Sequence, residues 1–276
     1  MNRATRFNGH STAGTPAEPP AACGIAFMAK ASSPGRAKTR LVPPLTFDEA
    51  AALNTAFLQD VADNLLLAVR HSAAAGGIAG YAAYGPAGAE AFFRSILPGS
   101  IGLIGAWQAN FGDCLFDTVA TILRRGHRAA VVLNSDSPTL PTALLIETAA
   151  VLARPGDRAV LGPSSDGGYY LLGLKAAHRR MFEDIAWSTA HVAGQTRERA
   201  REIGLEIHTL PLWYDVDDVD GLRRLSAELA GEAAQQGSGH LPHYAVQTAK
   251  LLSRLWRDRD FDRGSDRAAA VDEVHA

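Results

Sequence analysis

Short apolar runs alternate with longer amphipathic segments along most of this chain of 276 residues. Residues 23–29 are a continuous apolar run, and residues 128–133 are apolar after the initial Arg128; both are of the kind that forms buried strands. Residues 47–70 instead repeat apolar side chains at helical spacing. Strands that alternate with helices through short loops pair mostly in parallel, so the pattern predicts an α/β fold with helices on both faces of one sheet. The other predicted strands are 77–85, 100–105, 158–162, 169–174 and 206–212, and the other predicted helices are 87–97, 112–125, 141–153, 188–203 and 219–230.

The alternation is confined to the middle of the chain. Residues 1–22 are rich in proline, alanine and small polar residues, which bury little apolar surface, so we expect a flexible N-terminal arm. Residues 23–231 form the predicted domain. Residues 232–276 are expected to comprise a linker, one more amphipathic helix over 241–256 and a charged tail.

Composition excludes several classes of protein. With 27 basic and 29 acidic residues, the net charge of −2 leaves no basic footprint for nucleic acid or an anionic membrane. No apolar run approaches the ~20 residues of a membrane span, and the first 22 residues lack the apolar stretch of a secretory signal. Cys23 and Cys114 are too few for a disulfide framework or a thiolate zinc site. We therefore expect a cytoplasmic protein.

The loop after the first predicted strand is basic. Lys30, Arg36, Lys38 and Arg40 surround Gly35 there, although only four of the 27 basic residues in the chain are lysine. Arginine forks and lysine point charges on a turn can wrap a diphosphate or triphosphate. The loop matches neither of the standard glycine-rich phosphate motifs. A solvated basic loop is the alternative interpretation.

Carboxylates follow three more of the predicted strands. Asp136 comes after residues 128–133, where it could bind a divalent cation that bridges phosphates, or could cap the next helix. Asp166 precedes two glycines and could act as a general base or hydroxyl anchor, or could form an ordinary hairpin turn. Asp217 lies among four carboxylates in residues 215–220, which suggests either a metal site or a helix cap.

These four loops should lie together, because the carboxyl ends of parallel strands meet at one edge of a sheet. They would then supply a cationic phosphate cradle, two metal carboxylates and a glycine-lined wall. Such a set is suited to an activated nucleotide, for which catalysis is largely positioning and charge neutralisation.

Several motifs between residues 24 and 229 resemble one known family. They are 27–30 with 34–41, Gln108 with 112–113, 135–141, 162–174, 187–189 through 195–196, and 215–217. With these motifs the chain resembles the DUF2064 family of GT-A-like transferases, often called arsenosugar-biosynthesis or radical-SAM/selenodomain-associated glycosyltransferases. The family is distantly related to the phospholactate and molybdenum-cofactor guanylyltransferases. The resemblance implies a GT-A-like, nucleotide-diphospho-sugar transferase fold of Rossmann type.

The resemblance also implies roles for individual residues. Asp136 and Asp217 would bind Mg²⁺ or Mn²⁺, with Asp136 and Asp166 as the catalytic carboxylates. The residues implied to bind the phosphates of the nucleotide are Lys30, Gly35, Arg36, Lys38, Thr39 and Arg40. Those implied to face the donor or the acceptor are Gln108, Asp113, Gly167, Gly168, Tyr169 and Trp187.

The implied function is a glycosyltransferase that uses a nucleotide-sugar and a small-molecule acceptor, with a homodimer as the candidate assembly. A nucleotidyltransferase that joins an NTP to a small phosphorylated acceptor is the first alternative. A catalytically silent nucleotide-binding protein is the second, because residues 112–115 and 218–220 depart from the family pattern.

Overall fold

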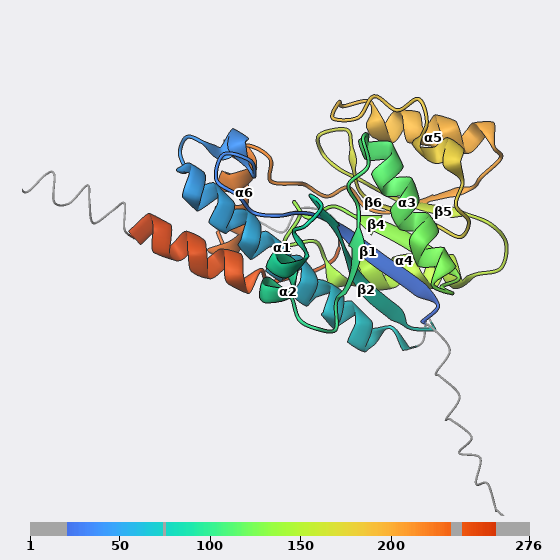
Figure 1. Cartoon of the computed structure of the whole chain (residues 1–276), viewed down its shortest axis with the longest axis horizontal. Coiled ribbons are helices and arrows are strands. Elements are labelled where there is room, and N and C mark those ends of the chain that lie inside the picture. Colours follow the sequence, from blue (N-terminus) through green and yellow to red (C-terminus); the bar gives the residue numbers. More distant parts are fainter. Residues whose placement is uncertain (1–20, 74–75, 233–238, 258–276) are drawn as a thin grey trace, which may run out of the picture.

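The computed structural model describes residues 21–73, 76–232 and 239–257. Within them, a seven-stranded sheet has the order β3-β2-β1-β4-β6-β5-β7 (Figure 1). Its strands are β1 (Cys23–Lys30), β2 (Ile78–Gly85), β3 (Gly102–Gly105), β4 (Ala129–Leu133), β5 (Ala159–Pro163), β6 (Tyr169–Leu174) and β7 (Ile207–Thr209). All strand pairs are parallel except those of β6, which runs antiparallel to both β4 and β5. The predicted α/β fold with a mostly parallel sheet is confirmed.

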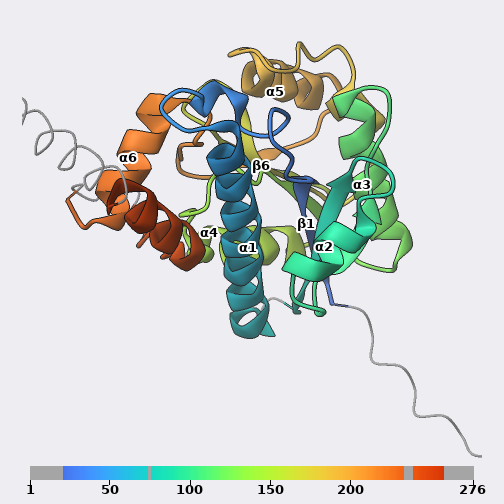
Figure 2. The same cartoon turned by 60° about the vertical axis from the view of Figure 1, so that its left-hand side comes forward.

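Helices pack on both faces of the sheet (Figures 1 and 2). They are α1 (Phe47–His71), α2 (Glu90–Ile96), α3 (Phe111–Arg124), α4 (Thr142–Ala153), α5 (Val192–Glu202) and α6 (Val219–Leu229). One apolar cluster joins Phe57 of α1 and Leu144 of α4 to one face, and a second joins Val119 of α3 to the other. Successive residues of β1 alternate between the two clusters, with Phe27 in the first and Ala26 in the second. This two-sided burial explains why the strand reads as a continuous apolar run.

One more helix lies beside α1 in both views and begins at residue 246, within the last described range of residues 239–257. The sequence predicted it over 241–256, and the structure has it over 246–257. The buried Asp60 carboxylate of α1 accepts hydrogen bonds from the backbone amides of Gln247 and Thr248, both at 2.8 Å. Leu252 joins the same apolar cluster as α1. The carboxylate thus caps this helix and fixes it to the core.

The remaining expectations for the ends of the chain fall largely on residues outside those that the structure describes. These are the arm over 1–20, the middle of the linker over 233–238 and the tail over 258–276. None of the described helices is both long enough and apolar enough to cross a membrane.

Because β1, β4, β5 and β7 are mutually parallel, their carboxyl ends lie at one edge of the sheet. The loops that follow these four strands are those that carry the basic segment and the three acidic segments singled out in the sequence. The topology therefore positions all four predicted loops on the same side of the molecule.

Candidate functional site

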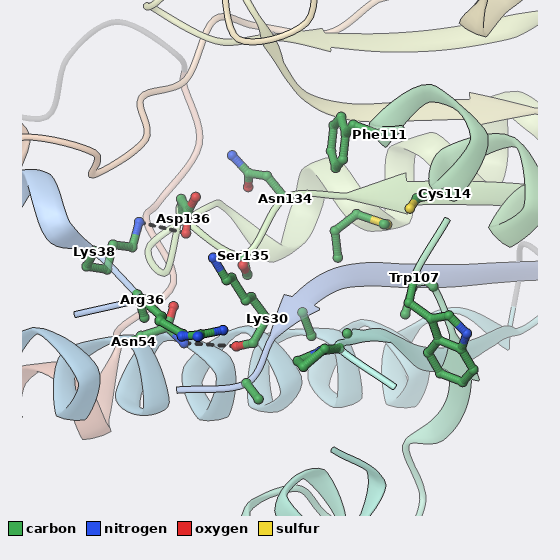
Figure 3. A pocket seen from close by; sticks show the side chains of 18 of the residues that line it. Lys30, Arg36, Lys38, Asn54, Trp107, Phe111, Cys114, Asn134, Ser135 and Asp136 are labelled. Atoms are coloured by element: carbon green, nitrogen blue, oxygen red, sulfur yellow. Dashed lines mark hydrogen bonds and ion pairs between the residues drawn. The ribbon is translucent and has the colours of Figure 1, made fainter. Parts of the chain in front are cut away.

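A cavity of about 1190 Å³ opens at this edge of the sheet. Its walls come from the loops after β1 and β4, from the segment between β3 and α3, and from the start of β6 (Figure 3). All six predicted phosphate-binding residues line it, together with both predicted metal carboxylates. Of the predicted donor- or acceptor-facing residues, Gln108 and Tyr169 line it as well.

Lys38 joins the two predicted metal carboxylates. Its Nζ lies 2.7 Å from Asp136 Oδ1 and 3.2 Å from Asp217 Oδ1, and donates a hydrogen bond to the backbone oxygen of Val216 at 2.8 Å. The Lys38 side chain is only 5% exposed, and Nζ lies 5.2 Å from the centre of the Phe57 ring. Three oxygens, two of them ionised, thus surround one position that is filled by an ammonium group with three donors.

The backbone of Lys38 is left-handed, with φ of 50°. A side chain other than glycine adopts this conformation at a cost of about 1 kcal/mol or more. The contacts of the ammonium group offset this cost.

Backbone and side-chain hydrogen bonds tie the loop after β4 to the segment after β7. The Val216 amide donates to the backbone oxygen of Asp136 at 2.8 Å. The Ser137 hydroxyl, which is buried, donates to the backbone oxygen of Tyr214 at 2.8 Å. These bonds bring Asp136 and Asp217 to the same ammonium group, although they are far apart in the sequence.

The other cations of the basic loop are less engaged. Within the described residues, no hydrogen bond or ion pair occupies Lys30 Nζ or the Arg36 guanidinium, and both groups face the cavity. Arg40 is mostly exposed, with Nη1 3.9 Å from Asp217 Oδ2. Lys30 and Arg36 are therefore available to an anion in the cavity.

The turn between β5 and β6 holds the predicted glycine-lined wall. Asp166 Oδ1 accepts a hydrogen bond from the Gly168 amide at 2.8 Å, as in an ordinary turn. Gly167 has φ of 89°, and a Cβ there would lie 2.2 Å from the backbone oxygen of Ala190. None of the three turn residues lines the cavity described above. The hairpin interpretation that the sequence left open describes this segment, and the missing side chain at Gly167 makes room for the protein's own backbone.

Gln108, Asp113 and Trp187 differ in their relation to the cavity. Gln108 lines it, while its Nε2 donates to an Asp117 carboxylate oxygen at 2.6 Å. Asp113 is ion-paired with Arg179 at 2.7 Å and does not line the cavity. Trp187 does not line it either.

Trp187 supports residues that do line the cavity. Its ring packs edge-on against Phe111 and Tyr169, with centroid distances of 5.3 and 6.4 Å. Both of these aromatic side chains line the cavity, so Trp187 buttresses its wall.

The cavity-wall residues that sequence reasoning missed include two large aromatic side chains and one amide with a buried oxygen. Trp107 and Phe111 are about half exposed and lie apart from the cations in Figure 3. Asn134 directly follows β4 and has a buried Oδ1 without a hydrogen-bond partner among the described residues. A search for large aromatic residues in loops at the carboxyl edge would have found the first two.

Asp215 adds a further carboxylate close to Asp217, one of the two carboxylates that Lys38 contacts. Burial raises the pKa of Asp215 to about 6, and the like charges of Asp166 and Asp217 contribute to the increase. A cation at the Lys38 position therefore stabilises an acidic region that carries more charge than Lys38 alone neutralises.

The donor set suits a hard cation, although the described residues contain no group of three or more histidine, cysteine, aspartate or glutamate side chains that could hold a metal ion. Mg²⁺ and Mn²⁺ prefer oxygen ligands, and at phosphate sites Mg²⁺ is commonly held by one or two carboxylates with phosphate and water oxygens. Asp136, Asp217 and the Val216 carbonyl provide oxygens around one point. These residues fit a metal whose other ligands come from a phosphate.

Residues 68–189 match the family model described as "uncharacterized protein conserved in bacteria (DUF2064)", which confirms the resemblance read from the motifs. No protein of curated function matches the sequence.

Solved structures provide further matches. A protein of Desulfovibrio desulfuricans G20, described as a "putative nucleotide-diphospho-sugar transferase", is 27% identical with a TM-score of 0.70. That match covers 85% of this chain and 95% of the other, and agrees with the predicted GT-A-like fold. A cytidylyltransferase of Leptospira borgpetersenii is 10% identical with a TM-score of 0.49, over 87% of this chain and 95% of the other. A CMP:2-keto-3-deoxy-manno-octonic acid synthetase in complex with CTP is 12% identical with a TM-score of 0.49, over 76% and 99%.

Proposed function

We propose that this chain is a metal-dependent transferase that uses a nucleotide-activated donor, and that the donor is a nucleotide-sugar. The observation that carries the proposal is the convergence of unpaired cations and paired carboxylates on one cavity. Lys30 and Arg36 face it without partners among the described residues, beside the oxygen-lined position between Asp136 and Asp217. The likeness to the Desulfovibrio protein supports a nucleotide-sugar rather than a free nucleotide.

The residues of the cavity have distinct tasks in this proposal. Asp136 and Asp217 would hold Mg²⁺ or Mn²⁺, which would neutralise the charge that develops on the diphosphate leaving group. Lys30 and Arg36 bind phosphate oxygens, and Arg36 can do so with two parallel hydrogen bonds. Gly35 and Thr39 present the loop backbone to the same phosphates. Arg40, at the cavity edge, adds positive charge to this side.

The opposite part of the cavity is assigned to the groups that react. Phe111 and Tyr169, which Trp187 supports, exclude water from the donor. Gln108 and Tyr169 also face the donor. Asp166, on the turn between β5 and β6, is the proposed base or hydroxyl anchor, and Asp113, which is paired with Arg179, is the proposed acceptor-side residue. The acceptor is a small molecule that carries a nucleophilic hydroxyl.

Nucleotidyl transfer is the second candidate function. The basic loop offers four cations, Lys30, Arg36, Lys38 and Arg40, and this charge matches a triphosphate as well as a diphosphate. In that reaction the acceptor would be a small phosphorylated molecule and the leaving group would be pyrophosphate.

Product analysis distinguishes the two reactions. The purified protein is incubated with Mn²⁺ and either a panel of nucleotide-sugars or a panel of NTPs, each with candidate acceptors. Release of free NDP supports glycosyl transfer, and release of pyrophosphate supports nucleotidyl transfer. D136N and D217N should each lose at least 100-fold in kcat/KM, about 2.7 kcal/mol of transition-state stabilisation. D157N, which changes an exposed carboxylate paired with His178, is the matched control.

A silent nucleotide-binding protein would behave differently in calorimetry. Its affinity for nucleotides would be indifferent to Mg²⁺ or Mn²⁺ and would be unchanged in D136A. That result, or full activity in both D136N and D217N, would refute the proposed metal-dependent transfer.

A further inference from the structure

Lys38 occupies the position that the proposed function gives to the metal. Its ammonium nitrogen is in contact with one oxygen from each of Asp136 and Asp217 and with the Val216 carbonyl. The dashed line between Lys38 and Asp136 in Figure 3 marks the first of these ion pairs. Sequence reasoning placed the lysine on the phosphates and left the carboxylates to the metal, whereas the structure pairs the lysine with the carboxylates.

We propose that Lys38 is a tethered counter-ion that is exchanged for the divalent cation when the site is loaded, that is, when the cation binds to Asp136 and Asp217. This inference rests on the proposed function for the identity of the cation. Before loading, the ammonium group holds Asp136 and Asp217 together against their mutual repulsion. On loading, the ammonium group leaves the carboxylates and becomes available to the phosphates of the donor.

Space and charge both favour the exchange. A divalent cation held by Asp136 and Asp217 would need carboxylate oxygens of the kind that Nζ now contacts at 2.7 and 3.2 Å. The divalent cation and the Lys38 ammonium group would repel each other strongly if both contacted these carboxylates, because the Lys38 side chain is only 5% exposed to solvent. Lys38 and a divalent ion therefore compete for the same oxygens.

The surroundings of Lys38 favour its release into the cavity. The residue lines the cavity together with Lys30 and Arg36, whose charged groups face the same space. A lysine has four flexible methylene groups, so Nζ can move while the backbone stays in place. Binding of the metal would thus release one more cation toward the part of the cavity that Lys30 and Arg36 line.

Metal affinity tests the competition directly. Mn²⁺ binding is measured by electron paramagnetic resonance and calorimetry, without substrate, for the wild type, K38M and K175M. K38M should bind Mn²⁺ about tenfold or more tightly than the wild type, since no ammonium group has to be displaced; tenfold corresponds to about 1.4 kcal/mol. K175M removes the same charge at the opposite edge of the sheet, where Lys175 donates to the Arg154 and Gly156 carbonyls, and should leave the affinity unchanged. Equal or weaker binding by K38M would overturn the exchange.

A second measurement uses the wild-type protein and does not depend on the variant folding. The chain has only four lysines, so isotope-labelled lysine gives four sets of side-chain NMR signals, and K38R identifies that of Lys38. Addition of Mg²⁺ should shift the Lys38 signals and leave those of Lys175 in place. Unshifted Lys38 signals at saturating Mg²⁺ would overturn the inference.

The outcomes separate this inference from the proposed function. Turnover of a nucleotide-activated donor with unaltered Mn²⁺ affinity in K38M would refute the exchange alone. Exchange without any turnover or nucleotide binding would refute the proposed function alone. Absence of metal binding in both the wild type and K38M would refute the exchange together with the metal-dependent part of the function.

Discussion

Substitution of Gly167 by alanine should destabilise the protein substantially. Gly167 has φ of 89°, a conformation that costs an L-residue about 1–3 kcal/mol. The added Cβ would lie 2.2 Å from the backbone oxygen of Ala190 and 2.6 Å from its Cα, and neither atom belongs to a flexible side chain. Relief requires separation of the two loops, which also strains the hydrogen bond from the Ala193 amide to the Gly167 oxygen at 3.0 Å.

These contributions add up to about 3 kcal/mol or more, when overpacking is counted at about 1–3 kcal/mol. For a protein of this size, that loss lowers Tm by about 6–12 °C. Urea unfolding, followed by circular dichroism at constant m, measures the free energy of unfolding, and calorimetry measures Tm.

The neighbouring glycine is the matched control. A Cβ at Gly168 would meet nothing closer than Asp166 Oδ1 at 3.1 Å, which is the end of a side chain that can rotate. G168A should therefore cost less than about 1 kcal/mol. Equal losses in the two variants, or a G167A protein within about 0.5 kcal/mol of the wild type, would refute the argument that Gly167 makes room for Ala190.

Three further outcomes are expected. In the metal-free protein, the pKa of Asp215 is raised from 3.8 to about 6, so the folded state retains a proton that the unfolded state has lost. The free energy of unfolding should therefore fall as pH rises from about 4 to about 6. D215N should flatten this slope, and an unaltered slope would contradict the assignment. D60A should lower the free energy of unfolding by about 2 kcal/mol and accelerate amide exchange in residues 246–257, because two helix-end amides lose a charged acceptor; unchanged exchange there would show that the cap is not needed. S137A should cost about 1–2 kcal/mol and weaken Mn²⁺ binding, because its hydroxyl ties the two acidic loops together through Tyr214; calorimetry that finds Mn²⁺ affinity intact would contradict the positioning role.

Strands with both faces buried could be predicted from their sequence. Residues 128–133 and 169–174 are almost wholly apolar, and they form β4 and β6 with bounds within one residue of the prediction. Residues 206–212 fared less well, since β7 ends at Thr209. Pro211 lacks an amide hydrogen, so regular pairing cannot continue through it. A local apolar pattern does not encode this limit unless the proline is given more weight than its neighbours.

Helix starts were harder to predict than helix existence. The helix expected from residue 188 begins at Val192, because Ser188 has φ of 63° and the chain turns before the helix. Likewise α2 begins at Glu90 instead of residue 87, after a turn in which Gly88 has φ of 83°. Helical periodicity does not report these left-handed positions, which delay the start of each helix.

The candidate site divides in the same way. Convergence of the basic loop and the carboxylates followed from the parallel topology, because strand order and direction fix where loops emerge. The partner of Lys38 could not be predicted, because its choice depends on a bond between residues 178 positions apart in the sequence. Spacing likewise does not distinguish Asp166, which forms a turn, from Asp136, which lines the cavity.

The residues that form the cation position are far apart in the sequence, and this has a consequence for biosynthesis. A nascent polypeptide completes β1 through β4 and acquires Lys38 and Asp136 long before Val216 and Asp217 leave the ribosome. Until then the ammonium group has one carboxylate partner instead of two, and the Asp136 backbone oxygen lacks the amide that holds it. In the proposed exchange, metal binding therefore requires synthesis of nearly the whole domain, and a product truncated before residue 216 retains the basic loop but lacks Val216 and Asp217.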